Sequence, residues 1–497
     1  MGRAAGAREQ PRSEEDATIE VAPTRECRSD DGERPQPTLA RRVAAERPAC
    51  FVAARHPWMG TTTVAFVAAP RIWQRGACNA ARIHYSDTLL GQTPAPVEER
   101  LILLRPGWIV DVQRGERVAG KAILVRGERI VDVRDAAAAP PAGAQVKDLP
   151  GVTLLPGLID AHVHLAWGGP AGPGLPGVDA ARATLEAGFT TVRNLGSTGQ
   201  ADFRLREAIE RGEVAGPRML VSGPGMGTKR GVCESVFQGE GTVGSMDEAA
   251  GKVRQLIGLG ADVIKVCAGG GVIATAADAE SIELGEDQLR AIVAEAHRLG
   301  RKVSAHAQGP AAIRNAVLAG VDSIEHGSLL DEPVARLMKE RGVTLVPTLR
   351  RLDFGLDQQR AAGAPEARLT ALKDSRDQTF KRLAAAAALG VPIVLGTDAT
   401  VLPHGRNAEE LEALVAIGLS PVDALRAATV RAAELLGWAD RVGEIRAGFY
   451  ADLVGVECDP LSGPSCLKQP VFVMKGGAVH REPAPPKAPA DTQPSFM

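Results

Sequence analysis

Between residues 158 and 439 the chain alternates short apolar runs with longer stretches in which apolar residues recur at helical spacing. Short apolar runs predict buried strands, and recurrence every three to four residues predicts amphipathic helices. The expected strands are 158–164, 190–195, 218–223, 263–267, 302–307, 322–326, 343–348 and 392–397. A doubly wound open sheet would alternate in the same way, but polar residues near the strand ends favour a (β/α)8 TIM barrel.

Three helices of this region have clear sequence signals. Ser245 and Glu248 stand at capping-box spacing before a helix expected over 246–258. A second helix, 287–299, has an apolar face. Ser420 is an N-cap residue followed by proline at the first helical position, so we expect one helix over 421–436.

Short strands with glycine turns flank this region on both sides. Before it, Gly127-Glu128 separates two apolar runs as a hairpin turn would, and after it the same texture returns in 451–456 and 471–477. The simplest architecture joins 100–157 and 440–482 into one small, discontinuous β-sandwich domain, with the barrel of 158–439 inserted. Residues 1–99 show no sustained periodicity and 483–497 are rich in Pro and Ala, so both are expected to be disordered.

Polar side chains stand at or near the ends of five of the expected strands. His162 and His164 alternate on one strand and therefore point the same way. By itself such a pair is equally well explained as two hydrogen-bonded core histidines. Four more polar residues occupy corresponding places on other strands, namely Lys265, His306, His326 and Asp398. In barrels the C-terminal strand ends meet at one mouth, so these six side chains are expected to converge there.

The motifs around these residues, PGLIDAHVH, VIKV, AHAQG, SIEHGS and GTDA, occur in the order typical of one family. From about Leu101 to about Arg481 the chain resembles the metal-dependent amidohydrolase superfamily. Its motifs are most similar to the branch of imidazolonepropionase-related and Xaa-Pro dipeptidase-like enzymes. The resemblance implies the barrel inserted into a small β-domain.

Six ligand candidates are too many for one open catalytic zinc, and they suit two metals about 3.5–4 Å apart. The resemblance implies that His162, His164 and Asp398 hold one ion and that His306 and His326 hold the other, and zinc is the expected metal. An ammonium has no lone pair for a metal, but related lysines react with CO2 to form a carbamate. Lys265 would bridge the two ions in that form; a snorkelling or salt-bridged lysine is the alternative.

The function implied is hydrolysis of an amide in a dipeptide, a C-terminal peptide bond or an N-acyl amino acid. Metal-activated hydroxide would attack the carbonyl, and Asp398 would shuttle the proton to the leaving amine. Lactonase or phosphotriesterase chemistry on the same centre is an alternative. Mononuclear imidazolonepropionase- or deaminase-type hydrolysis is a third, and a metal-free interaction protein of the same fold is a fourth.

Candidates for substrate contacts are Arg350 and Arg351 after the seventh strand, and His404 after Asp398. An arginine there could bind a carboxylate bidentately, although a solvated charged pair explains the sequence equally well. Cys267 lies near the expected mouth and is interpreted as a small buried thiol.

Composition narrows the choice of partners. A formal net charge of −2 provides no basic field for nucleic acid or a membrane surface, and no stretch of about twenty apolar residues predicts a membrane span. Seven scattered cysteines without a C-x-x-C motif argue against a disulfide framework and for a reducing, cytoplasmic compartment. A small-molecule substrate is expected, and a homo-oligomer is compatible with the sequence.

Overall fold

The computed structural model describes residues 100–167, 175–271 and 280–483. The extension 1–99 and the tail 484–497 lie outside the described residues. The remaining expectations for strands, helices and site residues can be compared with the structure.

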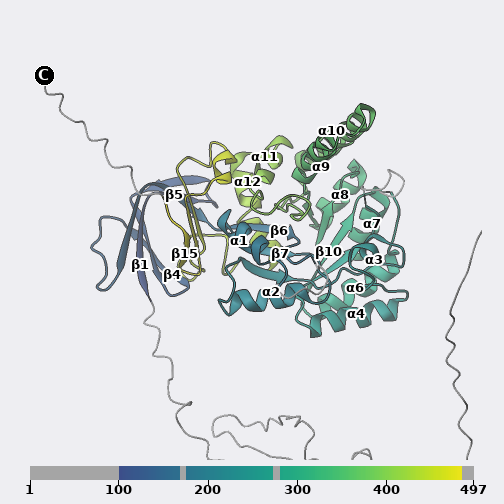
Figure 1. Ribbon diagram of the computed structural model, residues 1–497, viewed down its shortest axis with the longest axis horizontal. Coiled ribbons are helices and arrows are strands. Elements are labelled where there is room, and N and C mark those ends of the chain that lie inside the picture. Colours follow the sequence, from purple (N-terminus) through teal and green to yellow (C-terminus); the bar gives the residue numbers. More distant parts are fainter. Residues whose placement is uncertain (1–99, 168–174, 272–279, 484–497) are drawn as a thin grey trace, which may run out of the picture. The chain divides into compact units, whose positions relative to one another are not determined.

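The central region contains two parallel sheets surrounded by helices (Figure 1). The first sheet has the order β6-β7-β8 and the second has the order β12-β11-β10-β9. Their strands are β6 (Leu158–Val163), β7 (Phe189–Asn194), β8 (Arg218–Val221), β9 (Val263–Cys267), β10 (Lys302–Ala307), β11 (Ser323–His326) and β12 (Thr344–Val346). Each of the seven begins and ends within two residues of an expected strand. The arrangement is a TIM-barrel-type α/β fold.

The edges of the two sheets are linked by isolated parallel bridges. Met226 pairs with Val266 beyond β8, and on the other side Ile393 pairs with Leu345 while Ala399 pairs with Val163. The expected eighth strand, 392–397, is therefore not a regular strand, and that prediction is wrong in form. The backbone N–H of Leu395 donates to Ala427 O (3.0 Å), but Val394 N–H still donates to Leu345 O (3.0 Å) and Asp398 N–H to His162 O (2.8 Å). The segment therefore keeps backbone hydrogen bonds to both neighbouring strands.

Twelve α-helices and one 3-10 helix are described. They are α1 (Val178–Glu186), α2 (Ala201–Glu210), α3 (Val232–Val236), α4 (Met246–Gly258), α6 (Glu286–Arg298), α7 (Pro310–Ala319), α8 (Glu332–Arg341), α9 (Arg350–Ala361), α10 (Glu366–Leu389), α11 (Glu409–Ala416), α12 (Pro421–Ala427), α13 (Val430–Leu436) and η3 (Pro464–Lys468). The capping box of α4 is present as expected. The single helix expected over 421–436 is two helices, because Thr429 leaves the helical region (φ −136°, ψ −98°) and its hydroxyl donates to Leu425 O.

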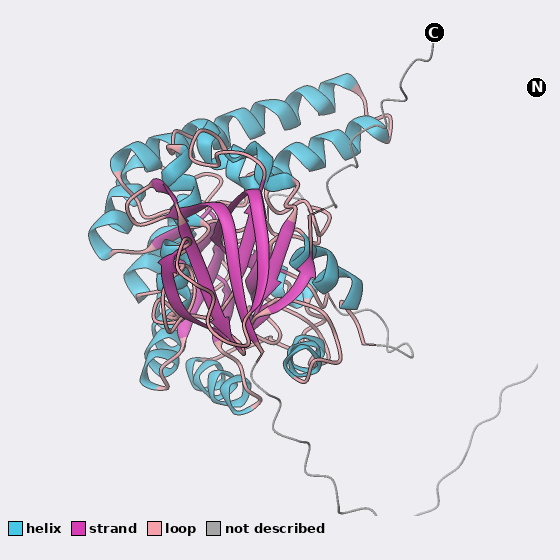
Figure 2. Ribbon diagram, turned by 90° about the vertical axis from the view of Figure 1, so that its left-hand side faces the viewer, coloured by secondary structure: helices cyan, strands magenta, loops and turns pink. Residues whose placement is uncertain are grey.

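The two flanking segments share one eight-stranded sheet, shown in front of the helices in Figure 2. Its order is β15-β14-β13-β5-β1-β3-β4, with β2 paired to β1. The strands are β1 (Leu101–Asp111), β2 (Glu116–Ala119), β3 (Lys121–Arg126), β4 (Arg129–Asp135), β5 (Gln145–Pro156), β13 (Leu453–Val456), β14 (Phe472–Lys475) and β15 (Ala478–Arg481). Antiparallel pairing of β13 with β5 joins the far ends of the described chain. The two packed sheets expected of a sandwich are thus not confirmed, because the strands form one continuous sheet.

This sheet shares a hydrophobic core with the barrel region. Leu155 at the end of β5 and Val454 on β13 belong to the same buried cluster as Leu158 and Phe189 of the first barrel strands. β5 ends at Pro156 and β6 begins at Leu158, so packing at this junction helps to position β6 and the histidine that it carries, His162.

Two disulfides correct the interpretation of the cysteines. Cys233 of α3 is bonded to Cys267 at the end of β9, and Cys458 is bonded to Cys466. Cys267 is therefore not a free thiol, and the cytoplasmic prediction loses the support that it drew from unpaired cysteines. Among the described helices, none is both long and apolar enough to cross a bilayer.

Candidate metal centre

Of the six side chains expected to converge, five come from strands of the two parallel sheets or directly follow one, and Asp398 comes from the irregular segment 392–399. Ring centroids lie 5.4 Å apart for His162 and His164, 5.0 Å for His162 and His326, and 4.6 Å for His306 and His326. Asp398 Oδ1 lies 3.5 Å from His162 Nε2 and 3.4 Å from His164 Nε2. The four imidazoles and the carboxylate therefore form one cluster, as the strand-end positions predict.

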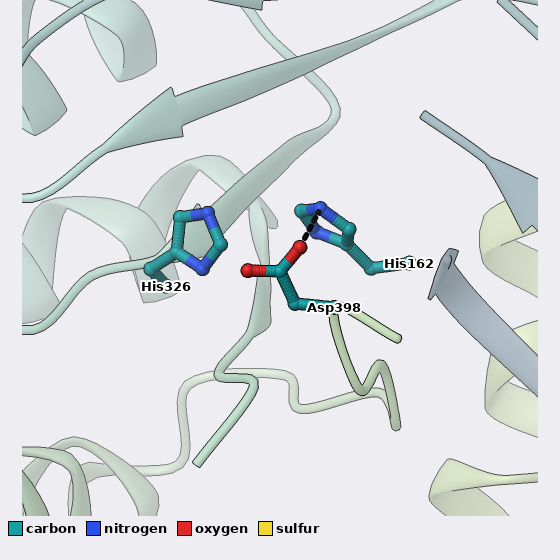
Figure 3. A group of neighbouring side chains, drawn as sticks. All are labelled: His162, His326 and Asp398. Carbon is teal, nitrogen blue, oxygen red and sulfur yellow. Dashed lines mark ion pairs between the residues drawn. The ribbon is translucent and has the colours of Figure 1, made fainter. Parts of the chain in front are cut away.

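Figure 3 shows how three of these groups face one another, with Asp398 between His162 and His326. One ligand atom from each of these three residues lies within 4.8 Å of those of the other two, and all three residues are buried. Imidazole nitrogen and carboxylate oxygen are ligands that zinc accepts. The donor set and its spacing thus fit a divalent metal.

In three of the histidines a hydrogen bond engages Nδ1, so that Nε2 is left for Asp398 or for a ligand. The Nδ1 atoms of His162, His164 and His326 lie 2.7 Å from Glu325 Oε2, 3.2 Å from Gly196 O and 2.7 Å from Thr348 Oγ1, respectively. Each Nε2 then keeps its lone pair, the usual arrangement for a metal-binding histidine. His306 is turned the other way, because its Nε2 lies 3.3 Å from Gly270 O.

Burial lowers the pKa values of His162, His306, His326 and Lys265, which favours their neutral forms. The pKa of His162 falls to about 4 and that of His306 to about 3, mainly through burial and also through the nearby charge of Lys265. The pKa of Lys265 falls to about 8 through burial, which the charges of Glu325 and Asp398 only partly oppose. Lys265 is thus close enough to act electrostatically on both histidines and on Asp398.

Asp398 remains ionised despite its burial. Burial by itself would raise the pKa of this carboxyl, but the hydrogen bond to His164 and the charges of His162 and Arg351 outweigh it and hold the pKa below its usual range. The site therefore offers a negative carboxylate beside His162, His306 and His326, whose pKa values burial lowers, and this combination suits a cation.

Three residues of the site have left-handed backbone conformations. His326, Thr348 and Asp398 have φ values of 73°, 50° and 59°. Such values are uncommon outside glycine and cost about 1–3 kcal/mol each where the surroundings enforce them, most of all for a β-branched residue such as Thr348. Strain of this kind collects at functional sites, and here it occurs at three adjoining strand ends.

The segment that carries Asp398 is held against β6 by a buried polar network. Asp160 Oδ2 accepts hydrogen bonds from Thr397 Oγ1 (2.6 Å) and Asn407 Nδ2 (2.8 Å), and its Oδ1 accepts one from His162 N (3.1 Å). A Cβ on Gly396 would lie 2.8 Å from His162 Cβ, so only glycine allows this approach. Asp160 and Gly396 belong to the motifs PGLIDAHVH and GTDA, but sequence reasoning assigned no role to either residue.

Glu325 is the most informative residue that sequence reasoning missed. It is fully buried and accepts hydrogen bonds from Arg193 Nη2 (2.9 Å), Ser304 Oγ (2.7 Å) and Ser323 Oγ (2.6 Å), while its other oxygen binds His162. Burial would raise its pKa, but Arg193 and His162 hold the pKa well below its usual range. An acidic residue inside an apolar strand, as in SIEHGS, was the available signal.

We expect Glu325→Gln to destabilise the fold strongly. The change leaves the Arg193 guanidinium buried without its counter-ion, which typically costs about 3–5 kcal/mol. Urea unfolding followed by circular dichroism measures the loss. The matched control is Glu332→Gln, which breaks the exposed Glu332–Arg336 pair on α8 (2.6 Å) and should cost less than about 1 kcal/mol. Similar losses in both variants would show that Glu325 is not needed to compensate Arg193.

The three expected substrate contacts have different surroundings. Arg350 and Arg351 begin α9 as the position after the seventh strand predicts, but only Arg351 approaches Asp398, at 3.6 Å from Nε to Oδ2. His404 lies near Thr184 Oγ1 (3.4 Å) and Thr400 Oγ1 (3.3 Å), and burial lowers its pKa to about 4. Its role as a substrate contact stays a prediction.

Comparison with known proteins decides the family. The model of the amidohydrolase family matches residues 153–481, which include every strand-end residue described above. This chain belongs to the amidohydrolase family. As such, it is a hydrolase that acts on carbon–nitrogen bonds.

Relatives of this amidohydrolase support the branch expected from the motifs. Ochratoxinase from Aspergillus niger is 33% identical over 66% of this chain and 76% of that protein. A crystal structure of a Xaa-Pro dipeptidase with bound methionine in the active site has a TM-score of 0.70 and 30% identity, covering 77% of this chain and 100% of that one. Imidazolonepropionase from Erwinia tasmaniensis is 25% identical over 70% of this chain and 89% of that protein.

Proposed function

We propose that this protein is a binuclear metal-dependent hydrolase that cleaves an amide bond in a dipeptide, a C-terminal peptide or an N-acyl amino acid. The observation that carries the proposal is a buried lysine, Lys265, among the imidazoles and the Asp398 carboxylate. An ammonium group on Lys265 would repel bound cations and has no lone pair with which to bind them. The names of the similar proteins, ochratoxinase and Xaa-Pro dipeptidase, support amide-type substrates.

The proposed ligand sets follow the motifs and the geometry. His162, His164 and Asp398 would hold one ion, and His306 and His326 would hold the other, with zinc as the metal that best suits these donors. His326 also lies within ligand distance of the His162 and Asp398 group, which suits two ions close together. When bound, such ions supply Lewis acidity and lower the pKa of water.

Lys265 would join the two sets as a carbamate. A carbamate forms when a neutral amine adds to the carbon of CO2 and loses one proton, which leaves an anion with two oxygen donors. The lowered pKa of Lys265, about 8, makes the neutral amine available near physiological pH. Burial by apolar neighbours therefore favours the chemical form that a shared ligand requires.

Asp398 is proposed to move the proton during hydrolysis. Its carboxylate is ionised and buried in the cluster, and its Oδ1 lies 3.5 Å from His162 Nε2 and 3.4 Å from His164 Nε2. It would accept a proton from the attacking water and donate it to the leaving amine, as a general base and then a general acid. The small β-domain of 100–157 and 440–482 is proposed to support the barrel from the end where β5 enters β6.

The test is metal content per chain, measured by mass spectrometry, together with a hydrolysis screen. The screen contains dipeptides, N-acyl amino acids, a lactone, a phosphotriester and imidazolonepropionate. About two divalent ions with amide hydrolysis are expected. One ion without amide hydrolysis would instead favour imidazolonepropionase-type or deaminase chemistry, and turnover of the lactone or phosphotriester alone would change the bond class.

A further inference from the structure

The two arginines that begin α9 have opposite environments, although they are adjacent in the sequence. Arg350 is neutralised by two carboxylates, with Nε 2.8 Å from Glu409 Oε2 and Nη1 2.9 Å from Asp353 Oδ2. Its side chain is 31% exposed. A guanidinium that is already paired twice at the surface has little left to offer a substrate.

Arg351 points toward the candidate metal centre and is incompletely paired. Its side chain is only 9% exposed, and its Nε donates to Thr348 Oγ1 at 3.0 Å and lies 3.6 Å from Asp398 Oδ2. Its Nη2 is buried and has no hydrogen-bond partner among the described residues. A buried charged donor without a partner is unfavourable, and an anionic ligand oxygen beside Nη2 would satisfy it.

The charge of Arg351 acts on the rest of the cluster. It lowers the pKa of His306 and His326 and helps to keep Asp398 ionised. The guanidinium is therefore close to histidines of both β10 and β11, beside the place where a substrate must lie to reach Asp398.

Two neighbours hold Arg351 in place before any substrate binds. The two oxygens of Glu410 on α11 accept the backbone N–H groups of Leu349 and Arg350, each at 2.7 Å, which fixes the start of α9. Thr348, in its left-handed conformation, contacts both Arg351 and His326. A side chain that is fixed in this way loses little conformational freedom when it binds a ligand.

We propose that Arg351 binds an anionic oxygen of the substrate, the carboxylate adjacent to the scissile amide, and that Glu410 is a positioning residue that holds Arg351 for this contact. A guanidinium presents its N–H groups in a fork that matches a carboxylate. The inference rests on the proposed amide hydrolysis and specifies the substrate class within it: acyl amino acids and peptides with a free carboxylate. It also assigns this contact to Arg351 and not to Arg350.

The test compares two substrates that differ only in charge, N-acetyl-L-methionine and N-acetyl-L-methioninamide, with acetate release as the readout. For Arg351→Gln we expect kcat/KM for the carboxylate to fall about ten- to hundredfold, mainly through KM, because a charge-assisted hydrogen bond contributes about 1.5–3 kcal/mol. Hydrolysis of the carboxamide should change little. Arg351→Lys keeps the charge without the fork and should lie between wild type and Arg351→Gln.

Three further variants separate positioning from general damage. Glu410→Gln should lower the preference for carboxylate over carboxamide while metal content stays near wild type, and the melting temperature should fall because the amide NH2 cannot accept one of the two backbone N–H groups. Arg360→Gln, at an exposed arginine later on α9, is the control and should leave both substrates unaffected. A loss of preference in Arg350→Gln instead of Arg351→Gln would overturn the assignment.

The outcomes distinguish this inference from the proposed function. Equal losses on both substrates in Arg351→Gln, with metal retained, would overturn the carboxylate contact and indicate stabilisation of charge developing on the carbonyl oxygen. Wild-type protein that binds two metals but hydrolyses neither compound, nor any amide of the screen, would overturn the proposed function itself.

Discussion

Replacing Lys265 with methionine is expected to remove most of the bound metal and to lower kcat/KM about a thousandfold, since several kcal/mol of stabilisation are lost with the ions. Methionine fills a similar volume in the buried strand but cannot form a carbamate. Metal content and kcat/KM are measured on the same preparation. Two ions retained per chain would show that Lys265 does not bridge them.

Two further variants sharpen this result. Lys302 is the first residue of the neighbouring strand β10, and its Nζ donates to Glu434 O at 3.1 Å. The Lys302→Met variant removes this partly buried lysine and should keep its bound metal. Lys265→Ala should leave a space that a small carboxylate can enter, so added propionate should restore part of the activity. Failure of every small carboxylate to restore metal binding would argue against an anionic group at this position.

Asp398→Asn is expected to reduce kcat about a thousandfold with little change in fold. Asparagine has the same shape and tolerates the left-handed conformation found here (φ 59°), but it cannot accept and return a proton. The melting temperature and kcat are the measurements. Asp452→Asn, at a buried aspartate just before β13 that pairs with Arg218 at the start of β8, controls for the loss of a buried charge and should leave kcat unchanged. Rates near wild type in Asp398→Asn would exclude it as the proton shuttle.

The main elements of the fold were predictable because their signals are local. Apolar runs gave seven of the barrel strands, and the Ser245 capping box gave the start of α4 at the right residue. The failures depend on interactions that are distant in sequence. In the eighth segment the backbone N–H of Leu395 donates to Ala427 O, outside the sheets, and the helix after Ser420 breaks at Thr429.

The site was predictable to the level of which side chains meet, but not of what holds them. His162, His164, His306, His326 and Asp398 stand at strand ends, and barrel geometry alone brings such positions together. The partners of these residues depend on side-chain directions across strands. Glu325 and Arg193 come from different strands, and the Cys233–Cys267 disulfide links a loop helix to β9, so spacing in the sequence could not reveal either pair.

The irregular segment between Leu345 and Val163 has a consequence for motion. Backbone hydrogen bonds hold it on both sides: Val394 N–H donates to Leu345 O (3.0 Å), and Asp398 N–H donates to His162 O (2.8 Å). Moving Asp398 away from the cluster therefore requires these bonds to break in a local opening. Such an opening would withdraw the only carboxylate of the proposed ligand set, so amide-hydrogen exchange in 392–399 and the release of a bound ion would be two measures of one local event.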